Sequence, residues 1–163
     1  MNIVQFSTND QLIIALRTLI AALLGALVGI ERWKSGKEAG MRTHALVAAA
    51  AALAVGLGEM VLAAGSGVDG DGTRVLHAVI TGIGFIGAGA ILHGKERTSG
   101  LTTAASVFNV SIIGACAGMG AVLLAVLGAV ASLTVLQVFG RVRSLLMPDH
   151  RHDDEHDAVL GDD

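Results

Sequence analysis

The sequence predicts an all-α integral membrane protein, a bundle of five transmembrane helices with the amino terminus outside and the carboxyl terminus in the cytoplasm. Residues 98–140 carry no charged side chain. One helix over them would run roughly 60 Å, about twice the ~30 Å bilayer core, so this stretch must cross twice. Hydrophobic residues make up 53% of the 163 residues, and the mean hydropathy is +0.67. That length suits one bundle without a second folded domain.

Apolar runs between charged residues give the five spans. Each run is long enough to cross the apolar core. The expected turn between the last two spans is the glycine-rich segment Gly114–Gly120. In chain order the spans are Gln11–Ile30, His44–Ala64, Val75–His93, Leu101–Ala117 and Met119–Phe139.

Basic residues sort to one side of this arrangement. The other side holds only Arg74, and Arg17 lies within the first span. Because short cytoplasmic loops are enriched in Lys and Arg, the basic side is predicted to be cytoplasmic. The residues on that side are Arg32, Lys34, Lys37, Arg42, Lys95, Arg97, Arg141, Arg143 and Arg151.

The chain then divides into a short outer segment (1–10), the transmembrane domain (11–140) and a cytoplasmic tail (141–163). After Pro148 the tail is acidic and poor in apolar residues, which predicts disorder. Its histidines, His150, His152 and His156, stand among carboxylates. The tail is therefore either a divalent-metal chelator or a solvated segment without fixed ligand geometry.

Arg17 and Glu59 are charged side chains inside apolar spans, where each costs free energy and usually faces the bundle interior. In the five-span arrangement both lie about 8–9 Å below the outer end of their spans. An Arg17–Glu59 ion pair is one hypothesis. The alternative is that Arg17 extends outward to the interface while Glu59 lies in the loop.

The fourth span holds further polar residues. Asn109 and Ser111 lie near its middle, and Thr102, Thr103 and Ser106 lie nearer its cytoplasmic end. They either line an ion or proton path or bond neighbouring helices.

The membrane domain has three histidines at span ends, where an amphipathic ring is tolerated at low cost: His44, His77 and His93. They have no Cys or carboxylate at ligand spacing, so we expect neither a metal site nor a cofactor. The sequence contains no Ser–His–Asp, H-E-x-x-H or paired-carboxylate pattern, so we do not expect an enzyme. No feature suggests nucleic-acid binding.

The string GIGFIGAGAIL, residues 82–92, contains a nominal G-x-G-x-x-G through Gly82, Gly84, Gly87 and Gly89. A dinucleotide loop would need a preceding strand, which the pattern does not show. Close helix packing through small residues, such as Gly84 with Ala88, is the favoured interpretation. Two more GxxxG pairs, Gly25 with Gly29 and Gly114 with Gly118, support it.

These motifs resemble the membrane domain of the MgtC/SapB family of bacterial inner-membrane proteins, over roughly residues 12–139. The matching blocks occur in family order: VGIER at 28–32, AGMRTHALV at 39–47, DGTR at 71–74, GIGFIGAGAIL at 82–92 and GLTTAAS at 100–106. The signature positions carried over are Glu31, Arg32, Arg42, Thr43, Asp71, Arg74, the four glycines of residues 82–89, Thr102 and Thr103.

The resemblance implies a five-helix inner-membrane protein linked to magnesium limitation and, in intracellular pathogens, to survival in host cells and virulence. It implies a non-enzymatic regulator whose partners are the lipid bilayer and other inner-membrane proteins, among them the membrane sector of the proton-translocating ATP synthase. A further expected partner is a second copy of the chain, in a homo-oligomer. The alternative is a magnesium or proton transporter. Longer members add a cytoplasmic domain after the fifth span. The family usually has Trp at the position of Phe108, and small or apolar residues at the positions of Asn109 and Ser111.

Overall fold

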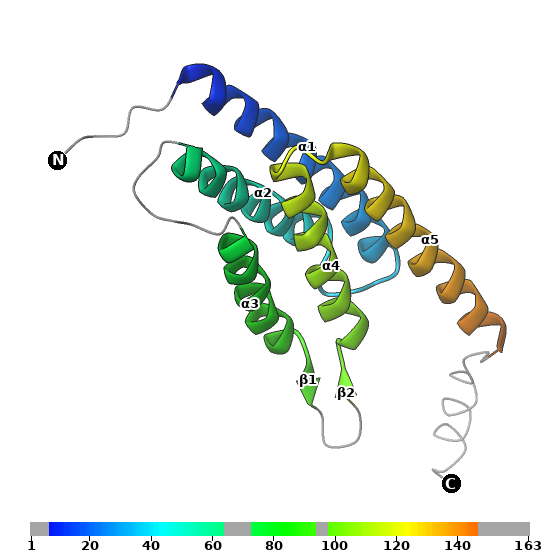
Figure 1. Cartoon of the computed structure of the whole chain (residues 1–163). Helices are drawn as coiled ribbons and strands as arrows, with labels where there is room; N and C mark the ends of the chain where they lie inside the picture. The colour runs from blue at the N-terminus through cyan, green and yellow to red at the C-terminus, as the bar shows by residue number, and fades with distance from the viewer. Residues whose placement is uncertain (1–6, 64–72, 94–97, 147–163) are drawn as a thin grey trace, which may run out of the picture.

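The computed structural model describes residues 7–63, 73–93 and 98–146 as five helices and one short hairpin (Figure 1). The strands β1 (Leu92–His93) and β2 (Thr98–Ser99) pair antiparallel between the third and fourth helices. The prediction of an all-helical architecture is confirmed apart from this hairpin. The helices are α1 (Thr8–Lys34), α2 (Met41–Ala63), α3 (Thr73–Gly89), α4 (Leu101–Gly118) and α5 (Val122–Leu146).

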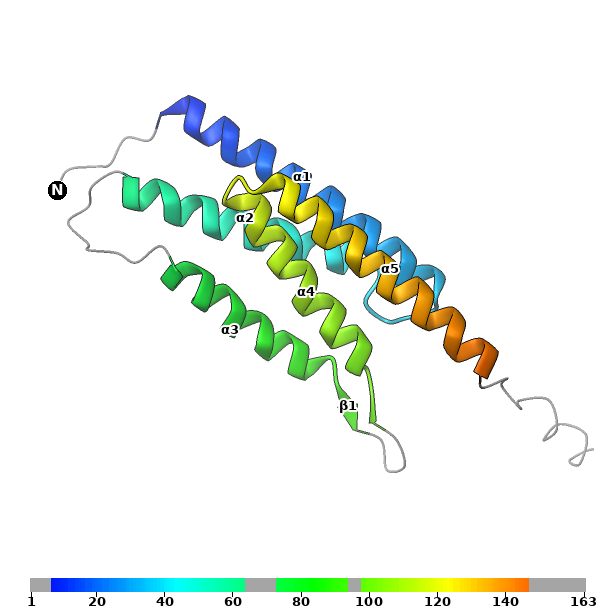
Figure 2. The same cartoon turned by 45° about the vertical axis from the view of Figure 1, so that its right-hand side comes forward.

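Four of the helices, α1, α2, α4 and α5, are long and apolar enough to cross a membrane, and α3 is a shorter apolar helix of 17 residues. Successive helices run in alternating directions, as Figures 1 and 2 show. One end of the bundle carries the α1–α2 connection, the β1–β2 hairpin and the end of α5; we call it the hairpin end. The opposite end carries the start of α1 and the α4–α5 turn.

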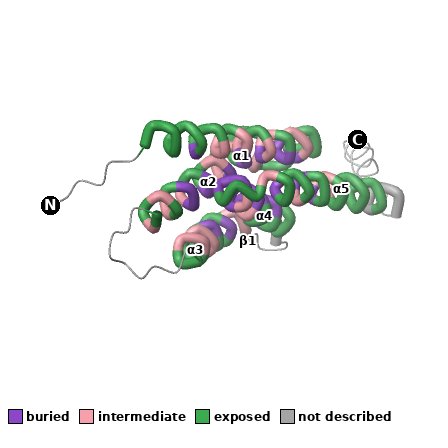
Figure 3. The backbone as a smooth tube through the Cα atoms, turned by 45° about the horizontal axis from the view of Figure 1, so that its top comes forward, coloured by how far each residue is buried: buried purple, intermediate pink, exposed green. Residues whose placement is uncertain are grey.

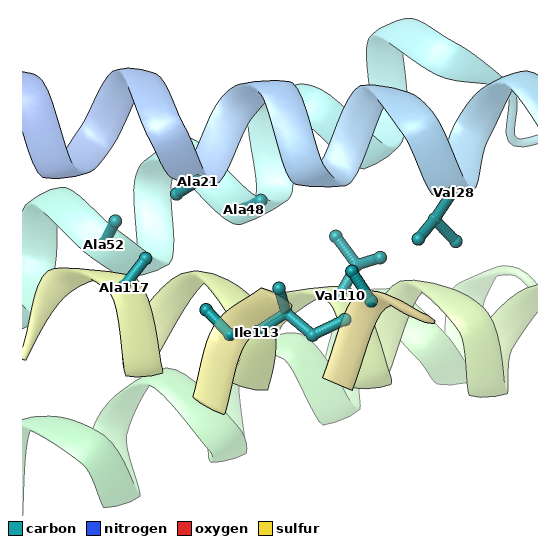
Figure 4. Packing of buried hydrophobic residues seen from close by; sticks show 9 residues of the cluster. Ala21, Val28, Ala48, Ala52, Val110, Ile113 and Ala117 are labelled. Atoms are coloured by element: carbon teal, nitrogen blue, oxygen red, sulfur yellow. The ribbon is translucent and has the colours of Figure 1, made fainter. Parts of the chain in front are cut away.

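The central element is α4, which packs against α1, α2, α3 and α5. Buried residues therefore concentrate along α4 and the helix faces turned toward it (Figure 3). Alanine dominates the core, and its small side chain lets the helices approach closely (Figure 4). The core residues are Ala21, Val28, Ala48, Ala52, Val110, Ile113, Ala117, Ala125 and Ala129.

The predicted end of the third helix and both predicted ends of the fifth are wrong. The third helix ends at Gly89 and not at His93: its last turn tightens, with Ala90 N donating to Gly87 O (3.1 Å) and Ile91 N to Ala88 O (3.2 Å), and the chain then enters β1. Its four glycines are weak helix formers, which favours this early end. The fifth helix begins at Val122, since Gly120 adopts a φ of +79° in the preceding turn, and it continues past Phe139 to Leu146.

The glycine motifs divide into two kinds. A Cβ on Gly114 or Gly118 would lie within 2.5 Å of an α2 carbonyl oxygen, and one on Gly25 would lie 2.5 Å from His44 O. The predicted close packing is therefore confirmed in α1 and α4. Within the described chain no helix packs on Gly84 and Ala88 of α3: both are exposed, and nothing lies within 4 Å of a Cβ on Gly84. Periodic small residues show that a face can pack closely, but not that another helix covers it.

Candidate functional site

Three of the sequence blocks meet inside the bundle at the hairpin end. The block at 28–32 closes α1, the block at 39–47 begins α2, and the block at 100–106 begins α4. Gly29 lets the start of α2 approach α1, because a Cβ there would lie 2.5 Å from Met41 Cα. A polar cluster is thus enclosed by three helices that come from distant parts of the chain.

His44 is the centre of this cluster and is fully buried, with 0% of its surface exposed. Its Nδ1 lies 2.9 Å from Gly40 O, and its Nε2 lies 3.1 Å from the Ser106 hydroxyl of α4. The Ser106 hydroxyl in turn donates to Thr103 O at 2.8 Å. The expectation that His44 rests at a span end as an interfacial ring is wrong, because the ring is turned inward and joins α2 to α4.

Glu31 and Arg32 form an ion pair beside the cluster. Arg32 donates from Nε and Nη2 to the two carboxylate oxygens at 2.5 and 2.8 Å, and the Ser35 hydroxyl donates to the same carboxylate at 2.9 Å. Arg32 is only 4% exposed. Removing one member of a buried pair leaves an uncompensated charge, so the two residues are expected to be mutually dependent. Both lie close enough to His44 to act on it electrostatically.

The remaining signature residues do not join the cluster by their side chains. Thr103 is buried and contributes its carbonyl, whereas Arg42, Thr43, Thr102 and Arg74 are exposed. Gly87 is buried against Ala104, and a Cβ on Gly82 or Gly89 would meet nothing within 4 Å in the described chain. Asp71, like the tail from residue 147 onward, lies outside the described residues.

At the opposite end, Arg17 and Glu59 form the hypothesised ion pair. Arg17 Nη1 lies 3.1 Å from Glu59 Oε2 and also donates to Gly118 O at 2.9 Å. The second bond places a cation at the carboxyl terminus of α4, where the helix dipole favours it. One guanidinium therefore joins α1, α2 and the end of α4.

Of the two polar residues in the middle of α4, Asn109 bonds a neighbouring helix and Ser111 bonds α4 itself. Asn109 donates to the Ser132 hydroxyl of α5 at 2.5 Å, and Ser132 donates to Gly128 O of its own helix at 2.6 Å. Ser111 is buried and donates to Phe108 O at 2.6 Å. Of the two interpretations drawn from the sequence, the Asn109 contact matches bonding between helices.

The His44–Ser106 contact resembles a base with a nucleophile, and Gly40 O orients the base as a third group would. Catalysis would also require a substrate to reach the hydroxyl, but His44 is 0% and Ser106 6% exposed. The geometry therefore suits a bond between helices better than a reaction centre. Within the described residues, no group of three or more His, Cys, Asp or Glu side chains is arranged to hold a metal ion.

Sequence comparisons place these helices among known bacterial proteins. The profile described as "MgtC family" matches residues 18–145. "Protein SrpB" of Synechococcus elongatus is 35% identical over 158 residues, covering 89% of this chain and 85% of SrpB. "Putative magnesium transporter YhiD" of Escherichia coli strain K12 is 37% identical over 140 residues, covering 84% of this chain and 65% of YhiD.

"Protein MgtC" of Salmonella typhimurium strain LT2 is 41% identical over 105 residues, covering 64% of this chain and 43% of MgtC. The chain thus spans less than two thirds of YhiD and less than half of MgtC. No solved structure matches it.

Proposed function

Since the chain belongs to the MgtC family, we propose that it is a multi-pass protein of the bacterial inner membrane and a non-enzymatic regulator of adaptation to low magnesium. It acts through contacts with other membrane proteins, for which the proton-translocating ATP synthase is one candidate. All five helices cross the bilayer, and the hairpin end with its basic residues faces the cytoplasm.

One observation carries this proposal: three polar side chains of the bundle bond its own helices to one another. Arg17 joins α1 to α2 and α4, His44 joins α2 to α4, and Asn109 joins α4 to α5. In a transporter, intramembrane polar groups mark the path of the substrate. Here they instead fix the helices relative to one another, as a protein that presents a defined surface to a partner requires.

Growth of a deletion strain at limiting magnesium tests the proposed role. The strain is complemented with the wild-type chain, with Arg32→Leu, which leaves Glu31 unpaired, and with the matched variant Arg42→Leu at an exposed position. We expect a growth defect that the wild type and Arg42→Leu correct and that Arg32→Leu does not correct at equal membrane abundance. Equal growth with and without the gene at limiting magnesium would exclude the role.

Transport is the second candidate, because one relative is named as a putative magnesium transporter. Purified protein in liposomes is assayed for magnesium-driven and proton-driven flux against empty vesicles. Flux that Glu59→Gln abolishes would favour transport. Flux equal to that of empty vesicles, with helical content intact by circular dichroism, would favour the regulator.

A further inference from the structure

The two ring nitrogens of His44 have partners with different chemistry. Gly40 O, 2.9 Å from Nδ1, is a carbonyl oxygen and only accepts. The Ser106 hydroxyl, 3.1 Å from Nε2, either donates or accepts. That hydroxyl also lies 2.8 Å from Thr103 O, a second group that only accepts. One side of the ring is therefore fixed as a donor, while the other side can serve in either role.

These partners allow two forms of the ring and disfavour a third. In the charged form, Nδ1–H donates to Gly40 O, Nε2–H donates to Ser106, and the hydroxyl donates to Thr103 O. In the neutral form with a hydrogen on Nδ1, the Ser106 hydroxyl rotates and donates to the bare Nε2. A neutral ring with its hydrogen on Nε2 would turn the Nδ1 lone pair toward the Gly40 lone pairs, which repel it. Burial makes this mismatch costly.

The charged groups around the ring come mainly from α1, which supplies Glu31 and Arg32. The sequence of α4 contains no ionisable side chain except Cys116, and its Thr103 and Ser106 are the polar residues nearest the ring. The titratable residues of α3, Arg74 and His77, belong to its first turns, away from the hairpin end. On α2 itself Arg42 is exposed. Among the residues that the structure describes, one carboxylate and one guanidinium, already paired, act on the ring.

We propose that His44 is a reversible proton-binding site inside the bundle. A proton binds to and leaves Nε2, and the Ser106 hydroxyl rotates between Nε2 and Thr103 O so that both states are hydrogen-bonded. The α2–α4 contact persists in either state, while the charge within it changes by one. This site goes beyond the regulatory role proposed above and does not depend on it.

Solid-state NMR of the full chain in lipid nanodiscs, with ¹⁵N in the histidine rings, tests the site directly. Spectra are recorded from about pH 5 to about pH 9, where histidine ordinarily titrates, and the His44 signals are identified by their loss in His44→Gln. At high pH we expect hydrogen on Nδ1 and a bare Nε2; acidification adds a hydrogen to Nε2 alone. A single unchanging form across the range in which circular dichroism shows intact helices would overturn the proposal, as would a bare Nδ1 at high pH.

Ser111→Ala provides a matched control for Ser106→Ala, because both serines are buried in α4 but Ser111 bonds only to its own helix. Ser106 bonds the ring in both states, but its bond to the charged ring is stronger by about the free energy of one pH unit. Ser106→Ala should therefore lower the midpoint pH of the His44 titration by about one unit. Ser111→Ala should leave it unchanged. Equal displacements would refute the role of Ser106. The wild-type titration decides the proton site even where Ser106→Ala does not fold.

Discussion

Gly114→Ala tests the packing of α4 against α2 most sharply. A Cβ at this position would lie 2.2 Å from Ala48 O and 2.8 Å from Ala48 Cα. Since non-bonded carbon atoms prefer separations of about 3.5–4.0 Å, α4 must move away from α2 by roughly 1 Å. Overpacking of this kind costs about 1–3 kcal/mol. The better helix propensity of alanine offsets about 0.5–1 kcal/mol of that loss.

Gly84→Ala is the matched control, because nothing in the described chain lies within 4 Å of its Cβ. Only the gain in helix propensity remains there, so this variant should be stabilised by up to about 1 kcal/mol. The two identical substitutions are thus expected to change stability in opposite directions.

Thermal unfolding in detergent micelles measures both variants. The single cysteine, Cys116, is half-buried in α4, so its labelling by a thiol-reactive fluorophore reports unfolding. We expect Tm to fall for Gly114→Ala and to stay level or rise for Gly84→Ala, with circular dichroism as an independent check. Equal changes in Tm would refute the conclusion that α4 and α2 are in backbone contact at Gly114.

Two further predictions concern the polar bonds between helices. Arg17→Leu should destabilise the bundle more than Glu59→Leu does, since Arg17 also bonds Gly118 O. Because both side chains are partly exposed, their coupling energy in a double-mutant cycle should be about 0.2–1 kcal/mol. Strictly additive losses in denaturant unfolding would contradict the pair. Asn109→Ala and Ser132→Ala should each lower the free energy of unfolding by about 0.6 kcal/mol in the same assay. The double variant should lose little more than either single variant, and a doubled loss would show that the two residues act separately.

Much of the fold could be predicted because the bilayer limits the choices. Apolar runs bounded by charges located α1, α2 and α4 to within a few residues. The common depth of Arg17 and Glu59 gave their ion pair as one of two hypotheses, and the structure decided between them. The end of α3 and the start of α5 were missed because they depend on local backbone bonds after Gly89 and on the positive φ of Gly120, which hydropathy does not record.

The centre of the candidate site could not be predicted in the same way. His44 and Ser106 are 62 residues apart in sequence, and a histidine at the edge of an apolar run has the same pattern whether its ring faces lipid headgroups or another helix. The nearest signal was the glycine pair Gly25 and Gly29 in α1, which indicated a close neighbour without identifying it. Burial of His44 follows only once α1, α2 and α4 are assembled.

The central position of α4 has a consequence for biosynthesis. Membrane chains are made from the amino terminus, so α1 and α2 leave the ribosome well before α4 does. During that interval the Nε2 of His44 and the Arg17 guanidinium lack the α4 groups that they contact in the finished bundle. The α1–α2 pair therefore acquires its full set of polar partners only once α4 has been made and packs between its neighbours.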